Sequence, residues 1–421
     1  MTATANPAVG VDGGVVTDPG QRRKILAAMC LALMAVIASV SILNVAQQDL
    51  ALDLGASQGT VLWILNAYTL ALAGLLLPIG AIGDRWGRKP VLVSGLVLFG
   101  LATLLCSVAN SSELLITGRA LAGAAAAMIM PVTLSVLTSS FPPEERGQAI
   151  GVWAGVAGAG GIIGMFVAAF MVDVATWRWA FILPGVLVVA AFAATLKAVP
   201  NSREHSEHRF DTVGSILSAV AIGALVLGIH EGPERGWSDT LTVAGLIVGG
   251  VSLVLFVVWE LRQHEPLLDM RAFSNRGLAA GSFTITLVFA VLFGIFLVLF
   301  PFLQGVLGWS ALRSAVAMLP MAAVMMPTST FAPRIAKRVG TRNTMLFGLV
   351  LISGGLALLA AMASVEGGYW SILPGLLVMG LGMGFTMTPS TEAITESLPA
   401  EKQGVASALN DTTREVGGAL G

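Results

Sequence analysis

Charged residues are scarce in this chain: they make up 11% of its 421 residues, against about 25% in an average soluble domain. Hydrophobic residues make up 56%, and the mean hydropathy is +0.84. A soluble fold cannot carry this balance, because too few polar side chains remain to cover its surface. The formal net charge of −1 also gives no field that would attract nucleic acid. We therefore predict an integral membrane protein whose main partner is the lipid bilayer.

Cysteine and histidine are almost absent. The two cysteines, Cys30 and Cys106, lie in apolar runs, and the four histidines show no ligand spacing. Metal sites need clustered ligands, so we expect no metal and no cofactor. The chain has no phosphate-binding loop with G-K-[ST], which argues against ATP hydrolysis, and no nucleophile–base constellation that would indicate an enzyme.

Long apolar runs are abundant. A helix needs about 20 mostly apolar residues to cross the hydrocarbon core, and in lipid such runs must be helical because every backbone polar group needs an internal partner. A thirteenth run begins near residue 403 and continues to Gly421. The twelve complete runs lie at about residues 25–46, 61–80, 90–109, 114–137, 147–171, 179–199, 212–230, 241–260, 278–303, 312–333, 343–363 and 370–391.

The placement of lysine and arginine predicts the orientation, since loops on the cytoplasmic side carry an excess of both. With a cytoplasmic N-terminus, eighteen of the 23 basic residues lie inside, and only Arg178, Arg235 and Arg313 lie outside. Arg119 and Arg414 fall within spans. We expect a multi-pass protein of the inner or plasma membrane, with residues 1–24 forming a disordered cytoplasmic tail and not a signal peptide.

The most specific string is G-A-I-G-D-R-W-G-R-K at residues 80–89, directly after the second span. Its glycines permit close approach of helices, and its aspartate can interact with a helix N-terminus or an arginine. Such a cluster can lock two bundles together in one state and release them in another; the alternative is a basic anchor at the membrane surface. The residues assigned to this gating loop are Gly80, Gly83, Asp84, Arg85, Gly87, Arg88 and Lys89.

This string resembles the signature loop of the major facilitator superfamily. Other strings resemble the fourteen-span drug:proton antiporter group of that family: W-I-L-N-A-Y at 63–68, Arg119 with Gly123, W-R-W-A-F at 177–181, and segments at 302–320 and 404–418. A basic string at 336–342 follows span ten as residues 83–89 follow span two, as expected for a transporter built of two related halves. The resemblance covers about residues 25–421.

The resemblance implies an all-α integral membrane fold with two six-helix bundles of the major facilitator type and two extra central helices. The N-terminal bundle would be residues 25–199. A cytoplasmic linker and the two inserted helices would follow at 200–270, and an incomplete C-terminal bundle at 271–421. The last helix of the group is missing, so the chain resembles a C-terminally truncated member.

The chain also departs from the group's pattern. Ser39 stands where an acidic residue is often found in span one. The span-five string G-P-x-x-G-G has become G-M-F-V-A-A, with changes at Met165, Ala168 and Ala169, and Ala311 replaces a proline. Proton antiport is therefore implied by the resemblance and weakened by these losses.

Charges within the spans are candidates for proton coupling, because a charge at helix centre costs about 2.5–3.5 kcal/mol on insertion scales. Arg119 cannot lose its proton near neutral pH, so its role would be electrostatic; the alternative is snorkelling to the interface. Asp411 and Glu415 are four residues apart and share a helix face. The alternative for them is a self-neutralising pair of Asp411 with Arg414.

Polar residues within apolar spans are candidates for a substrate cavity. They are Asn44, Trp63, Asn66, Tyr68 and Gln304. Small residues permit close helix contact and can form a sliding seam between the halves, or serve tight packing alone. The seam candidates are Gly123, Gly155, Gly158 and Gly164.

The leading hypothesis is a secondary active transporter that exports a small lipophilic drug or secondary metabolite in exchange for protons. One alternative is a uniporter or importer of a small metabolite on the same fold. Another is a truncated membrane protein that binds a partner and transports nothing. The oligomeric state is not predicted.

Overall fold

The computed structural model describes residues 11–12, 15–200, 210–399 and 402–421. Residues 1–10 and 13–14 of the predicted tail and residues 201–209 of the predicted linker therefore lie outside the described residues. The described chain is almost entirely helical. Its elements are β1 (Val11–Asp12), β2 (Val15–Val16), α1 (Pro19–Leu54), α2 (Gln58–Trp86), α3 (Arg88–Ser107), α4 (Ser112–Ser140), α5 (Pro143–Val174), η1 (Trp177–Phe181), α6 (Ile182–Ala198), α7 (Thr212–Arg235), α8 (Thr240–Arg262), η2 (Met270–Ser274), α9 (Arg276–Pro301), η3 (Phe302–Val306), α10 (Ala311–Val339), α11 (Thr341–Met362), α12 (Gly368–Glu396) and α13 (Gln403–Leu420).

Eleven of these helices, within the described part of the chain, are long and apolar enough to cross a membrane. They coincide, apart from their ends, with eleven of the twelve predicted spans. The remaining prediction, 147–171, falls within α5, a single helix of 32 residues. The protein is thus an all-α, multi-pass membrane protein.

Several helices extend beyond the predicted spans, because polar end residues continue or cap them. Asp18 caps α1 by accepting hydrogen bonds from the backbone N–H groups of Gly20 and Gln21, at 2.9 and 3.2 Å. Helix α1 thus begins at Pro19, so the predicted tail of residues 1–24 is too long.

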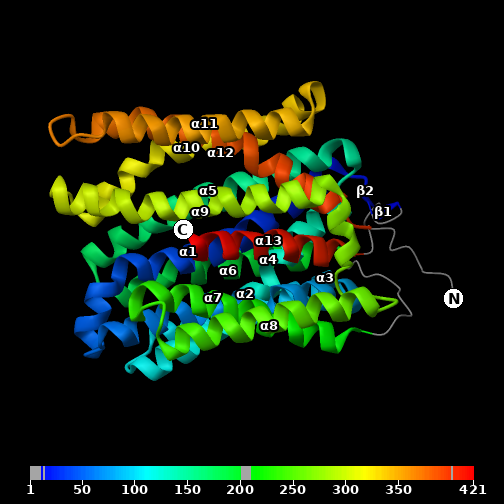
Figure 1. The fold of residues 1–421 in the computed structure, drawn as a ribbon, viewed down its shortest axis with the longest axis horizontal. Helices are drawn as coiled ribbons and strands as arrows, with labels where there is room; N and C mark the ends of the chain where they lie inside the picture. Colours follow the sequence, from blue (N-terminus) through cyan, green and yellow to red (C-terminus); the bar gives the residue numbers. More distant parts are fainter. Residues whose placement is uncertain (1–10, 13–14, 201–209, 400–401) are drawn as a thin grey trace.

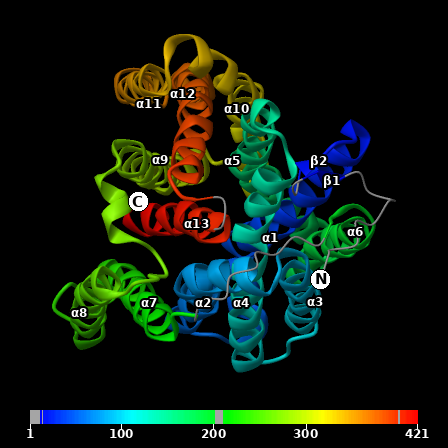
Figure 2. The same ribbon diagram turned by 90° about the vertical axis from the view of Figure 1, so that its right-hand side faces the viewer.

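The helices run side by side along one common direction (Figure 1). Seen end-on, α1–α6 form one group and α9–α13 form another (Figure 2). The two halves meet along two seams: α5 packs against α10, and α13 packs against α2 and α4. Helices α7 and α8 pack on each other outside the two groups, with α7 lying against α2.

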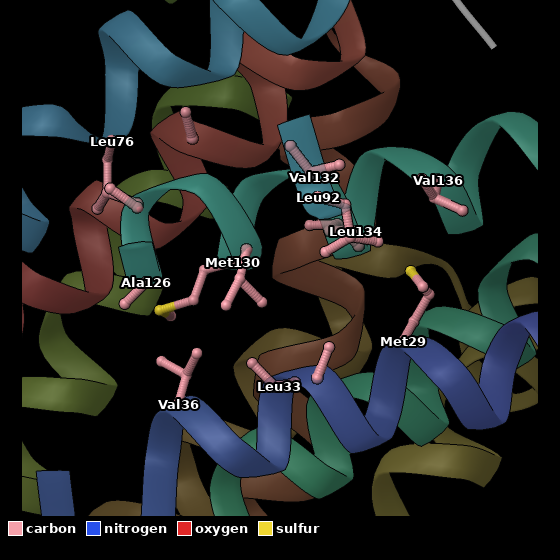
Figure 3. Packing of buried hydrophobic residues seen from close by; sticks show 14 of the residues in the cluster. Met29, Leu33, Val36, Leu76, Leu92, Ala126, Met130, Val132, Leu134 and Val136 are labelled. Atoms are coloured by element: carbon pink, nitrogen blue, oxygen red, sulfur yellow. The ribbon is translucent and has the colours of Figure 1, made fainter. Parts of the chain in front are cut away.

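The largest core lies within the first half and extends to the second. Met29, Leu33 and Val36 line one face of α1 at helical spacing and point toward α4, where Met130 is nearby (Figure 3). Val405 and Ala408 of α13 belong to the same buried cluster. Apolar packing therefore joins α13 to the first half.

The end of the bundle where α1 begins is called the inner end below, and the opposite end the outer end. At the outer end, Trp177 and Arg178 donate hydrogen bonds to Asp53 Oδ2 at 3.1 and 2.6 Å. The Arg178 hydrogen bond, aided by that of Trp177, holds the pKa of Asp53 below its usual range. The W-R-W-A-F string thus ties the start of α6 to the end of α1.

Candidate functional site

A cavity of about 210 Å³ lies between the two halves. Its walls come from α1, α2, α4, α5, α7, α9 and α13. Phe289, Phe293 and Phe296 follow one another at spacings of four and three, so they form one aromatic face of α9. Pockets for drug-sized ligands usually measure about 300–1,000 Å³, so this cavity must widen to hold such a molecule.

Polar groups are few in this apolar cavity. Tyr68, His230, Arg414 and Glu415 line it together with the aromatic face. Tyr68 is the predicted cavity residue that the structure places there, and its hydroxyl donates a 3.4 Å hydrogen bond to the carbonyl oxygen of Val36. Glu415, predicted for proton coupling, is also one of the residues that line the cavity.

Asp411 lies one turn from Glu415 on α13 and is fully buried. Its Oδ1 accepts a 3.1 Å hydrogen bond from the Asn410 side chain, while its Oδ2 has no partner among the described residues. No ion pair joins Asp411 to Arg414 in the described part of the chain, so the self-neutralising pair considered from the sequence is not formed. A buried carboxyl oxygen without a partner is a place where a proton can be held.

Arg414 instead lies between aromatic rings of both halves. Its guanidinium carbon is 4.7 Å from the ring centroid of Trp153 and 5.3 Å from that of Phe289. Its Nη2 also donates to Thr391 Oγ1 at 3.4 Å. Cation–π contacts of this kind contribute about 0.5–2 kcal/mol, so Arg414 helps to hold α13 against α5 and α9.

Arg119 is buried within α4, with 1% of its surface exposed. Its guanidinium carbon lies 4.2 Å from the centroid of the Tyr68 ring, and its Nη1 donates to the Ser39 hydroxyl at 3.2 Å and to the Ser39 carbonyl at 3.3 Å. The side chain therefore points into the bundle and does not snorkel. Ser39, which occupies the position of a frequent acidic residue, provides a neutral partner for this charge.

The other predicted cavity residues lie elsewhere. Trp63 and Asn66 are half-buried on α2, outside the set of residues that line the cavity. Gln304 is exposed on η3, near the outer end. Asn44 belongs to α1, and its side chain lies outside the described residues.

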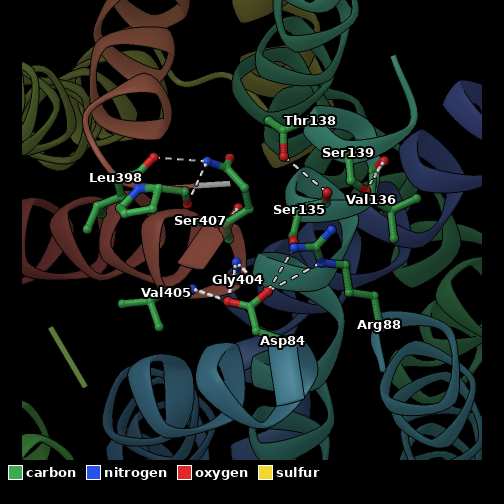
Figure 4. A network of polar contacts seen from close by, with 12 residues as sticks. Asp84, Arg88, Ser135, Val136, Thr138, Ser139, Leu398, Gly404, Val405 and Ser407 are labelled. Atoms are coloured by element: carbon green, nitrogen blue, oxygen red, sulfur yellow. Dashed lines mark hydrogen bonds and ion pairs between the residues drawn. The ribbon is translucent and has the colours of Figure 1, made fainter. Parts of the chain in front are cut away.

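Asp84 forms the most elaborate polar contact at the inner end (Figure 4). The backbone N–H of Gly404 donates to both of its carboxylate oxygens, at 2.9 and 2.7 Å, and the N–H of Val405 donates at 3.2 Å. Arg88 Nη2 donates to Asp84 Oδ1 at 3.0 Å. Asp84 of the first half thus caps the N-terminus of α13 in the second half, where a negative charge is favoured.

The predicted gating loop is mostly helical. Its residues up to Trp86 continue α2, α3 begins at Arg88, and Gly87 alone joins the two with a φ of 111°. Such a positive φ suits glycine. Lys89 donates to the carbonyl oxygen of Leu196 at 3.1 Å, tying this corner to α6.

Gly83 and Arg85 of the gating string also lie at this corner. Gly83 is buried against Val132 of α4. Arg85 lines a second cavity, of about 650 Å³, at the inner end. The string therefore contacts both its own half and the second half.

Glycines bring helices close at both seams. A Cβ on Gly80 would lie 2.5 Å from the carbonyl oxygen of Gly404, and one on Gly151 would lie 2.6 Å from that of Ser329 on α10. Gly155 faces Met326 of α10 at 3.5 Å. The inner parts of both seams are therefore closed by direct backbone contact.

The other predicted seam residues differ in position. Gly123 faces the backbone of Tyr68, so it lies in the contact of α4 with α2 inside the first half. Gly164 is buried on α5, and Gly158 lies on the same helix at a position whose surroundings are outside the described residues.

The seam of α5 with α10 has a related contact at the inner end. Lys337 on α10 donates to the carbonyl oxygen of Glu144, in the first turn of α5, at 3.1 Å. In the alignment of 83–89 with 336–342, Lys337 takes the position of Asp84. A cation cannot cap the N–H groups of a helix N-terminus, so here it binds a carbonyl oxygen instead.

Two parts of the cavity were missed from the sequence. The aromatic face of α9 has a helical spacing that could have been recognised. His230 lies at the end of α7, outside both bundles, and no sequence pattern places it at the cavity.

Two helix bundles around a central, mostly apolar cavity, with charged groups buried inside the membrane, define the chain as a transporter fold. Comparison with known proteins agrees: the model of the Major Facilitator Superfamily matches residues 29–421. The chain belongs to the Major Facilitator Superfamily, whose members are transporters and not enzymes.

Two curated relatives are exporters or resistance proteins by name. The puromycin resistance protein pur8 of Streptomyces alboniger is 32% identical over 420 residues, covering 98% of this chain and 83% of the relative. The tetracenomycin C resistance and export protein of Streptomyces glaucescens is 30% identical over 402 residues, covering 94% of this chain and 74% of the relative.

A solved structure agrees in fold. The human organic anion transporter MFSD10 superposes with a TM-score of 0.67 at 13% identity, covering 96% of this chain and 93% of that one. At this identity, the likeness concerns the fold alone.

Proposed function

We propose that this protein is a secondary active exporter that moves small lipophilic molecules, such as drugs or secondary metabolites, out of the cell in exchange for protons. The names of the relatives support export of such molecules. The cavity supports a lipophilic substrate, because its walls are mostly apolar and aromatic.

The observation that carries the proton coupling is the arrangement on α13. Glu415 lines the cavity, while Asp411 is buried one turn away with an oxygen that lacks a partner among the described residues. Arg414 lies between these two acids in the sequence of α13. A proton and a substrate can thus compete for one region. Arg119, which stacks on the cavity residue Tyr68, would contribute a fixed positive charge nearby.

We further propose that the layout is that of the fourteen-span group, with α7 and α8 as the inserted pair and the N-terminus in the cytoplasm. The outside position of α7 and α8 supports the insertion. The string from Gly80 to Lys89 would act as the inner gate. It would release α13 when the cavity opens to the cytoplasm. Gly151 and Gly155 would allow α5 to slide against α10 in the other seam.

Transport by proteoliposomes loaded with the pH dye pyranine tests this function. With ethidium as the probe, an imposed proton gradient should drive ethidium uphill and protons in the opposite direction. Asp411→Asn and Glu415→Gln should lower the coupled proton flux about tenfold or more, as expected when an essential acid is removed. Glu366→Gln, at an exposed position between α11 and α12, is the matched control.

Other outcomes favour the alternatives. Ethidium flux that ignores the pH gradient would indicate a uniporter. If wild type and Asp84→Asn both behaved like empty vesicles, the chain would be a binding protein without transport activity.

A further inference from the structure

Helix α7 stands outside both bundles, yet it reaches the central cavity. It packs on α2 and also contacts α13, the two helices that form one of the seams between the halves. At the inner end this seam is closed by Gly80 and Gly404. The cavity lies farther along the seam: its lining residue Leu72 is eight residues before Gly80, about 12 Å along α2. There, α7 contributes His230 to the cavity wall.

The surroundings of His230 leave its imidazole available to a ligand. Its side chain is half-buried, and no hydrogen bond to it is found among the residues that the structure describes. The next residue, Glu231, is occupied by an ion pair with Arg235. Gly418 and Ala419 of α13, two small residues, line the cavity together with His230.

At this wall of the cavity, the imidazole of His230 is a polar group next to apolar aromatic side chains. Phe293 and Phe296 provide flat aromatic contacts, and a neutral imidazole can both donate and accept a hydrogen bond. A site that hydrogen-bonds a substrate rejects an analogue without that group, because a buried polar group is then left unpaired.

We infer that His230 is a specificity-determining residue of the cavity, which selects aromatic substrates bearing a hydroxyl or carbonyl group, and that α7 closes the side of the cavity between α2 and α13. This inference rests on the proposed function for its substrate. The position of α7 at the cavity can be tested without transport.

Cysteine labelling tests the position. The chain has only two cysteines, Cys30 and Cys106, so a background with both changed to serine is easily made. In purified protein, His230→Cys should react with the cationic thiol reagent MTSET about tenfold faster than Val220→Cys, because thiols ionise and react in water and not within an apolar layer. Val220 is the matched control on the same helix, 41% exposed on the surface of the fold. Equal rates at the two positions would overturn the inference.

Binding of two probes tests the selectivity. Hoechst 33258 carries a phenol, whereas tetraphenylphosphonium has no hydrogen-bonding group. His230→Ala should weaken Hoechst 33258 binding about tenfold, the equivalent of one hydrogen bond of about 1.4 kcal/mol, and leave tetraphenylphosphonium binding unchanged. His230→Gln should restore most of the loss, and Val220→Ala should have no effect.

An equal change for both probes, or none for Hoechst 33258, would refute the selectivity. If the wild-type protein bound neither probe, the proposed substrate class would fail, whereas fast labelling at position 230 would still establish α7 as a cavity wall.

Discussion

Asp84 shows how one carboxylate can join two halves of a transporter. Two backbone N–H groups of α13 and the guanidinium of Arg88 donate to it, and its side chain is almost fully buried. Loss of a helix cap costs about 0.5–2 kcal/mol, and loss of one partner of a buried ion pair costs about 3–5 kcal/mol. The contact exists only while α2 and α13 are together, so its energy favours the state closed at the inner end.

Asp84→Ala should therefore open the inner part of this seam, and Asp84→Asn should do so less because an amide oxygen still accepts hydrogen bonds. A cysteine at Ser407, which is fully buried on α13, reports the opening through its rate of modification by MTSET. Asp239→Asn is the control, since Asp239 also caps a helix, α8, but lies away from the seam. Unchanged labelling in Asp84→Ala would contradict this role.

At the scale of elements, the seam of α5 with α10 depends on glycines that allow backbones to touch. Gly151→Ala should lower the thermal unfolding midpoint by a few degrees, because the added methyl group would overlap the Ser329 carbonyl and overpacking costs about 1–3 kcal/mol. Gly354→Ala on α11 meets nothing within 4 Å. It should be neutral or stabilising, since alanine favours helix by about 1 kcal/mol over glycine. Equal effects of the two changes would show that close approach at Gly151 is unimportant.

The elements themselves were largely predictable, and their contacts were not. Apolar runs of sufficient length must be helices in lipid, so all twelve predicted spans coincide with observed helices. The sequence could not show that Gly123 faces Tyr68 within one half while Gly151 faces α10, because that depends on how each helix is rotated about its axis. The ends of the helices were also predicted incorrectly, since α2 continues to Trp86, through most of the predicted gating loop.

At the scale of the whole molecule, the inner end is predicted to face the cytoplasm. Arg342 lies at the inner end, at the start of α11, and Arg313 at the outer end, near the start of α10, and both are exposed. In a background without the native cysteines, an impermeant maleimide added to intact cells should label Arg313→Cys. It should label Arg342→Cys only after permeabilisation. The reverse pattern would invert the membrane orientation and make the proposed inner gate an outer one.

The sequence by itself determined that this chain spans a membrane many times, and its strings predicted the family that the comparison confirmed. It also predicted roles for Asp84, from the string that follows the second span, and for Arg119, Asp411 and Glu415, because ionisable groups in apolar runs are conspicuous. Only the tertiary structure decided their partners: Asp84 meets the N-terminus of a helix 320 residues away, Arg119 stacks on Tyr68, and His230 joins the cavity while Gln304 does not. The physical reason is that membrane insertion responds to the hydropathy of each segment separately, whereas a cavity is formed by side chains of several helices whose packing is not local in sequence.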